Sequence, residues 1–160
     1  MPTCLLLDVD LPGQTGLQLQ DTLIEKGHEV PIVFLSGNSD ISVCAKAFRS
    51  GAVDFLTKPV VLEKLDTAVR SAVAKAEKHR QFKLEHASLR LRYESLTDEE
   101  KAVTRLVLSG KLNKQLALEI GVSERTIKKY RANVLEKMGV PALPHLVRAM
   151  ILLHGNDAVA

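Results

Sequence analysis

The 160-residue sequence contains no tryptophan, only two cysteines, and few aromatic residues, which make up 4% of the chain. With so few aromatic rings, recognition of single-stranded nucleic acid by base stacking is not expected. Cys4 and Cys44 stand alone and form no ligand cluster, so we interpret both as small core residues in a reducing, cytoplasmic setting. The sequence also lacks a signal peptide and a long apolar run, so we expect no membrane partner.

The charge of the chain is distributed unevenly. Charged residues make up 26% and hydrophobic residues 46%, as in a soluble globular protein with room for one or two domains. Residues 1–96 contain twelve Lys and Arg against twelve Asp and Glu, whereas residues 97–160 contain ten against seven. The net charge of +3 therefore comes entirely from the C-terminal part.

The segment GVSERTIKKYRANVLEKMGV, residues 121–140, has the pattern of a tight turn leading into a helix. Gly121 can adopt the left-handed conformation that ends one helix, and Ser123 can cap the next. Upstream, Asn113 is the predicted N-cap of the short helix KQLALEI. Two helices joined in this way indicate a helix-turn-helix.

The helix that begins at Ser123 has an apolar side and a basic side. Ile127, Val134, Leu135 and Met138 occupy one side, while the opposite side is rich in cations. This pattern is typical of a recognition helix that enters the DNA major groove, and a solvated helix in a small bundle is the alternative. We predict that Lys128 and Lys129 reach base edges. The residues predicted to contact phosphate are Lys114, Ser123, Arg125, Thr126, Arg131 and Asn133.

Two further helices complete this predicted all-α four-helix domain, residues 95–156. Thr97 and Glu100 form a capping box at the start of the first helix. The last helix, 142–153, is rich in apolar residues, which suit core packing and also contact with a second copy. Residues 157–160 are predicted to be a frayed tail.

The N-terminal part alternates short apolar runs with helical patterns. Residues 3–7, 31–35 and 52–56 are predicted strands, with helices at 15–26 and 40–49, which indicates a doubly wound α/β fold with a parallel sheet. In the first helix we expect Leu17, Thr22, Leu23 and Ile24 to pack against the sheet. A helix over 61–93 follows, and residues 75–94 are interpreted as a solvated helical linker. The alternative, a basic helix that grips DNA, is less favoured because Glu77, Glu85 and Glu94 interrupt the basic residues.

Polar side chains follow all three predicted strands. Asp8, Ser36 and Lys58 should therefore gather at one edge of the sheet. A carboxylate, a hydroxyl and an ammonium in this arrangement suit phosphoryl transfer to Asp8, with Ser36 and Lys58 holding phosphate oxygens. Each residue alone is also explained as an ordinary strand-end polar group.

Two sets of motifs resemble known families. LTDEEKAVTRLVLSGKLNKQLALEIGVSERTIKKYRANVLEKMGV is similar to the DNA-binding domain of LuxR-type regulators, particularly the FixJ branch. DVDLPGQTG, FLSGN and FLTKP resemble the response-regulator receiver family. The second resemblance implies that Asp8 is the phosphoacceptor, that the Asp10 carbonyl helps Asp8 to bind Mg²⁺, and that Ser36 and Phe55 form a switch pair.

The resemblance also implies a shortened receiver. Residues 1–74 correspond to a receiver without its first two strands and helices, so we expect an incomplete Mg²⁺ site at Asp8 and Asp10. Residues 5–7 should form an exposed apolar sheet edge. We expect control by such a receiver to be lost, leaving DNA binding either constitutive or absent.

Together the motifs predict a transcription regulator of a two-component system, and not an enzyme. The implied partners are double-stranded DNA, a sensor histidine kinase, a second copy of the chain and RNA polymerase. The resemblance to the receiver family implies that dimerisation would use the helix from Asp40, the strand from Ala52 and the helix from Val61. Two alternatives stay open: a small aspartate-dependent phosphatase, and an interaction adaptor that has lost DNA binding.

Overall fold

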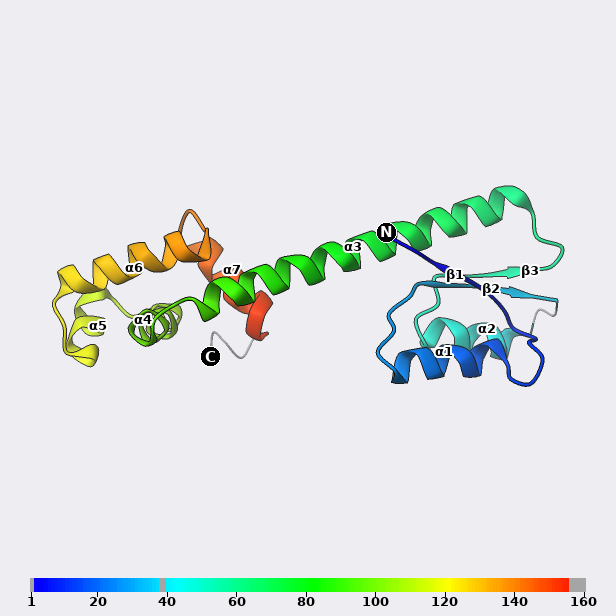
Figure 1. The fold of residues 1–160 in the computed structure, drawn as a ribbon, viewed down its shortest axis with the longest axis horizontal. Helices are drawn as coiled ribbons and strands as arrows, with labels where there is room; N and C mark the ends of the chain where they lie inside the picture. Colours follow the sequence, from blue (N-terminus) through cyan, green and yellow to red (C-terminus); the bar gives the residue numbers. More distant parts are fainter. Residues whose placement is uncertain (1, 38–39, 156–160) are drawn as a thin grey trace. The chain divides into compact units, whose positions relative to one another are not determined.

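A computed structural model describes residues 2–37 and 40–155, and it divides into two compact units, Met1–Phe82 and Lys83–Ala160. The long helix α3 (Leu62–Glu94) begins in the first unit and ends in the second (Figure 1). The predicted tail, residues 157–160, lies outside the described residues.

The first unit contains a three-stranded parallel sheet in the order β1-β2-β3. Strands β1 (Leu5–Asp8), β2 (Ile32–Ser36) and β3 (Asp54–Thr57) alternate with helices α1 (Gly16–Glu25) and α2 (Ile41–Arg49). Leu7 pairs with Phe34, which pairs with Phe55. The predicted parallel α/β arrangement is confirmed.

Helices cover both faces of this sheet. Side chains alternate along a strand, so Phe34 and Val33 of β2 point to opposite faces. Phe34 packs in a cluster with Leu17 of α1 and Ala47 of α2, whereas Val33 packs with Ala68 and Ala72 of α3. Figure 1 shows α1 and α2 on one side of the sheet and the first part of α3 on the other.

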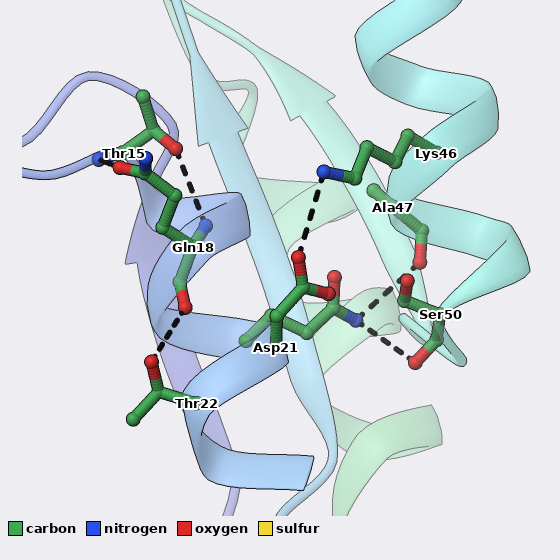
Figure 2. Close-up of polar contacts among 8 residues, drawn as sticks. Thr15, Gln18, Asp21, Thr22, Lys46, Ala47 and Ser50 are labelled. Carbon is green, nitrogen blue, oxygen red and sulfur yellow. Dashed lines mark hydrogen bonds and ion pairs between the residues drawn. The ribbon is translucent and has the colours of Figure 1, made fainter. Parts of the chain in front are cut away.

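The buried side of α1 differs from the sequence prediction. Ile24 is 53% exposed, so its predicted packing role is wrong, while Gln20 is 2% exposed. The Gln20 amide can be buried because its Nε2 donates to the Ala47 and Ser50 carbonyls at the end of α2, at 3.4 and 3.1 Å. Figure 2 shows these two acceptors beside α1.

The same surface of α1 carries its N-cap and an ion pair. Thr15 caps the helix in a capping box with Gln18, and the Lys46 ammonium of α2 lies 3.5 Å from the Asp21 carboxylate (Figure 2). The capping box fixes the start of α1, and the ion pair links α1 to α2.

Strand β1 lies at an edge of the sheet. Leu6 is 44% exposed, in agreement with the predicted apolar edge. Leu7 is 4% exposed because it faces the α1 and α2 side, so the prediction of an exposed edge is wrong for this residue.

The second unit is helical, as predicted. It contains α4 (Asp98–Leu108), α5 (Asn113–Ile120), α6 (Glu124–Met138) and α7 (Leu143–His154), preceded by the end of α3. One core cluster joins α4, α5 and α6 through Val103, Leu116 and Ile127. A second core cluster joins α3, α6 and α7 and includes Leu89, Leu96, Val134, Met138 and Leu146. Among the described helices, none is long and apolar enough to span a membrane.

Candidate functional site

The carboxyl ends of the strands bring two of the predicted site residues into contact. Asp8 ends β1 and Lys58 follows β3, and the Lys58 ammonium pairs with Oδ2 of Asp8. The other oxygen of Asp8, Oδ1, accepts from the backbone N–H of Asp10 at 3.1 Å. The two side chains come from opposite sides of β2, so the twist and register of the sheet hold them together.

The environment of Asp8 favours its charged form. The hydrogen bond from Lys58, followed by that from the Asp10 N–H, lowers the pKa of the Asp8 carboxyl below its ordinary value. The Asp8 side chain is nevertheless 30% exposed and that of Lys58 is 44% exposed. An ionised, accessible carboxylate beside an ammonium can act as a nucleophile toward an anionic electrophile.

Ser36 and Phe55 lie on the neighbouring strands. Ser36 ends β2 and is 2% exposed, and its carbonyl accepts from the Lys58 N–H at 2.7 Å. Phe55 is half-buried, and its ring centroid lies 6.3 Å from that of Phe34. Asp8, Ser36 and Lys58 therefore share one edge of the sheet, with Phe55 behind it on β3.

Sequence reasoning did not assign a role to Gly16, the first residue of α1. A Cβ at this position would lie 2.2 Å from the Asp8 carbonyl oxygen, which is impossibly close. Glycine is thus required for α1 to begin directly against the end of β1. The available signal was the second glycine in DVDLPGQTG, placed immediately after the capping residue Thr15.

Mg²⁺ prefers six oxygen ligands in an octahedral arrangement. The donors near Asp8 are its carboxylate and the carbonyl and carboxylate of Asp10, which is exposed. No group of three or more potential metal-ligating side chains occurs among the residues that the structure describes. These residues supply part of a Mg²⁺ site and do not fit a complete one, so no chemical step is assigned to the ion.

The turn between α5 and α6 has the predicted geometry. Gly121 adopts the left-handed conformation with φ 76°, and its N–H bonds to the Ala117 carbonyl at 3.0 Å. Oγ of Ser123 accepts from the Thr126 N–H at 3.1 Å and lies 2.9 Å from the Thr126 hydroxyl. The roles of Gly121 as terminator and Ser123 as cap are confirmed.

Helix α6 has one buried side and one basic side. Ile127, Val134 and Met138 are at most 1% exposed. Among the predicted DNA contacts, the exposed residues are Lys114 on α5, Ser123 in the turn, and Arg125, Lys128 and Lys129 on α6. The apolar positions hold the helix against α4 and α5, and this leaves the lysines accessible.

Asn113 has a different role from the one predicted. It is the first residue of α5 rather than its cap, and the N-cap position is Leu112, whose N–H is bonded by Oε1 of Gln115 at 2.8 Å. Oδ1 of Asn113 instead accepts from the Arg131 guanidinium of α6. Arg131 is half-buried, and this bond ties the start of α5 to the middle of α6.

Glu100 makes a network that the sequence did not reveal. Its side chain is 3% exposed and pairs with the Lys137 ammonium at 2.7 Å, while Oε2 also accepts from the Thr97 N–H at 2.9 Å. Burial raises the pKa of Glu100, but the bonds from Lys137, Thr97 and Asn133 outweigh it and lower the pKa. The capping box was the only sequence signal, because Glu100 and Lys137 are far apart along the chain.

Comparison with known proteins agrees with the two-unit arrangement. Residues 1–70 match the family model of the response regulator receiver domain, and residues 94–150 match that of the bacterial regulatory proteins of the luxR family. The response regulator protein TodT of Pseudomonas putida is 45% identical over 145 residues. The match covers 91% of this chain and 64% of TodT, so the chain spans less than two thirds of that relative's length.

Two further matches cover a larger share of the other protein. The transcriptional regulatory protein FixJ of Bradyrhizobium diazoefficiens is 34% identical over 145 residues, which are 91% of this chain and 71% of FixJ. The solved structure of the response regulator StyR is 35% identical with a TM-score of 0.76, covering 91% of this chain and 74% of StyR.

Proposed function

The chain belongs to the response regulators that join a receiver domain to a LuxR-type domain, and from this premise we propose that it is a DNA-binding transcription regulator of a two-component system. Its named relatives are response regulators and transcriptional regulators, which favours neither a phosphatase nor a DNA-free adaptor. We infer that the chain is not an enzyme and that it acts in the cytoplasm, where bacterial DNA lies.

One observation supports DNA binding most directly. Lys128 and Lys129 are exposed on α6, whereas Ile127 between the turn and these lysines is fully buried. Because the backbone of α6 is held from behind, the lysines can enter a major groove and reach base edges. Arg125, Thr126, Ser123 and Lys114 surround the helix start, and we propose that they contact phosphates.

Arg131 and Asn133 remain predicted phosphate contacts, although the side chain of each already interacts with another residue of the second unit. Arg131 already donates to Asn113, and Asn133 interacts with Glu100. A guanidinium has five N–H donors, so its bond to Asn113 leaves capacity for phosphate. We propose that both residues act mainly by setting the register of α6, with phosphate contact as a second role.

Replacing Lys128 tests this function. Lys128→Ala should weaken binding to a preferred duplex by about 1–3 kcal/mol and relax its sequence preference. Fluorescence anisotropy with a duplex enriched from a random pool by the unmodified chain, and with a shuffled duplex, measures both effects. Arg148→Ala, which removes an exposed cation from α7, is the matched control. Unchanged binding of Lys128→Ala to both duplexes would rule out the proposed recognition surface.

For the first unit we propose that Asp8 is the phosphoacceptor. A carboxylate oxygen of Asp8 would form a bond to phosphorus, the bond from phosphorus to the donor would break, and its electron pair would leave with the donor. Lys58 and Ser36 would contact the phosphoryl oxygens, and Phe55 would respond with Ser36 as the switch pair. Asp8 and the Asp10 carbonyl stay the predicted protein ligands for Mg²⁺.

The phosphoryl donor in the cell would be a sensor histidine kinase. A homodimer would place two DNA-binding units on an operator with two half-sites, and RNA polymerase would be the target of regulation. Incubation with acetyl phosphate, with and without Mg²⁺, followed by intact mass measurement, tests Asp8. A phosphoryl adduct that persists in Asp8→Asn would contradict the assignment.

A further inference from the structure

We propose that Arg92 of α3 and Glu100 of α4 are positioning residues for DNA recognition, because together they hold the C-terminal end of α6. This inference rests on the proposed function and concerns the basic side of α6 that carries Lys128 and Lys129. Neither side chain needs to touch DNA. Their partners are Met138 and Lys137, consecutive residues in the last turn of α6.

Glu100 provides the first connection. Its carboxylate is 3% exposed and bonds both to Lys137 of α6 and to the N–H of Thr97, the cap of α4. A buried carboxylate needs such partners, because an unpaired one would be strongly destabilising. The pair therefore fixes the end of α6 relative to the start of α4.

Arg92 provides the second connection. Its Nη1 donates to the Met138 carbonyl at 3.0 Å, one of the carbonyls left without a partner at a helix end. The guanidinium lies directly over Gly139, where a Cβ would come within 2.5 Å of Nη1. Gly139 is favoured by its left-handed φ of 65°, and a side chain there would also displace the guanidinium of Arg92 from this place.

These two connections act together with packing. Leu89 and Leu96, on either side of Arg92, share a core cluster with Val134 and Met138 of α6. The last turns of α3 are therefore built into the DNA-binding unit. At its other end, α6 is fixed by Ile127 among residues of α4 and α5.

The geometry of α6 explains why its far end matters for DNA. Lys128 lies nine residues before Lys137, or about 13 Å along the helix axis. Holding both ends fixes the tilt and the rotation of α6, and hence the direction in which Lys128 and Lys129 point. Loss of one connection should reduce discrimination between sequences more than it reduces contact with phosphates.

The experiment measures binding of the full chain to two duplexes, one enriched from a random pool by the unmodified chain and one shuffled. Arg92→Ala should weaken the enriched complex about ten-fold and the shuffled complex much less. The slope of binding against salt should stay unchanged, whereas loss of a direct phosphate contact would lower it by about one. Circular dichroism at the assay temperature establishes that each variant is folded.

The matched control is Arg90→Ala. Arg90 carries the same charge two residues earlier on α3 and pairs with Glu94 at the surface, where both side chains are more than half exposed. Its loss should change affinity for either duplex less than about two-fold. Where Arg92→Ala fails to fold, Arg92→Lys keeps the charge without the planar group, and it should show an intermediate loss of discrimination.

Glu100→Gln tests the same inference by removing a negative charge, whereas Arg92→Ala removes a positive one. Removing this negative charge should strengthen DNA binding on charge alone. It also weakens the charge-assisted bond to Lys137, and the looser positioning of α6 should weaken the enriched complex. The control is Asp98→Asn, which removes an exposed acidic residue from the same turn of α4. This variant should not weaken binding to the enriched duplex. Equal behaviour of Arg92→Ala and Arg90→Ala, or tighter binding by Glu100→Gln, overturns this inference alone. Failure of the unmodified chain to enrich any duplex overturns the proposed function as well.

Discussion

The pair Asp8–Lys58 in the first unit and the pair Glu100–Lys137 in the second each join distant parts of the chain, and the two pairs differ in burial. In the first unit Asp8 and Lys58 meet at the strand ends, with side chains 30% and 44% exposed. In the second unit Glu100 is 3% exposed beneath Lys137, which is 38% exposed. The accessible carboxylate can meet a reactant, whereas the buried one can only hold helices together. Burial therefore separates a carboxylate that is accessible to a reactant from one that is a structural connection, although both pairs join a carboxylate to a lysine.

The largest effect should come from leaving the buried carboxylate without its cation. Lys137→Met removes the ammonium, and the buried Glu100 carboxylate then keeps only uncharged partners, the Thr97 N–H and the Asn133 side chain, among those described for it. We expect the free energy of unfolding of the second unit to fall by about 3 kcal/mol. Protonation of Glu100 sets an upper limit to this loss, because the neutral carboxyl group costs less to bury. Hydrogen exchange of the α4 and α6 amides measures this locally, which matters because a chain of two units need not unfold in one step.

The matched variant in the first unit is Lys58→Met. Asp8 stays in contact with water when Lys58 is removed, so the sheet should lose far less stability than the second unit does. Equal protection losses in the β2 amides of Lys58→Met and the α6 amides of Lys137→Met would show that burial does not distinguish the two pairs.

The sequence predicted both units and placed Asp8 and Lys58 at one edge of the sheet, but it did not predict the pair Glu100–Lys137, for a physical reason. Strand ends, capping residues and helix faces depend on near neighbours, so Asp8, Ser123 and Ile127 were placed correctly. The partner of Glu100 depends on how α6 crosses α4, and periodicity within one helix contains no information about that crossing. Gln20 shows the same limit, because its burial depends on two carbonyls of α2.

Asn113 illustrates a competition that local patterns could not decide. Asparagine is a strong N-cap residue, and it stands directly before an apolar run. Two other hydrogen bonds are present instead. Oε1 of Gln115 accepts from the Leu112 N–H, and the Arg131 guanidinium of α6 donates to Oδ1 of Asn113. Only the second of these requires the tertiary structure, and the first was visible as a glutamine three residues after Leu112.

A smaller effect should appear on acidification. The folded state lowers the pKa of Glu100, whose ordinary value is 4.5, despite the opposing effect of burial. A lowered pKa stabilises the fold above the ordinary value, and this contribution is lost as pH falls through the folded value. Lys137 of α6 and Glu99 of α4 are the charged groups whose interactions with Glu100 enter this balance.

The measurement compares the unmodified chain with Glu100→Gln. The difference in unfolding free energy of the second unit should be largest near pH 6 and should shrink as pH falls below about 4.5, because the Glu100 carboxyl of the unfolded chain takes up a proton there before that of the folded chain. Asp98→Asn serves as the control for loss of an acidic residue from the same turn. A difference that grows on acidification would contradict a lowered pKa for Glu100.

The smallest expected effect is the response of the two carboxyl groups to salt. At 1 M salt the screening length falls to about 3 Å, and screening acts mainly on groups in contact with water. The pKa of Asp8, lowered chiefly by the Lys58 bond, should move upward toward its ordinary value of 3.8. That of Glu100 should move less, because its carboxylate is covered. Carbon-detected NMR titration of both carboxyl groups at low and high salt measures these shifts. A larger shift for Glu100 than for Asp8 would mean that water reaches the buried pair, and the separation between a reactive and a structural carboxylate would then fail.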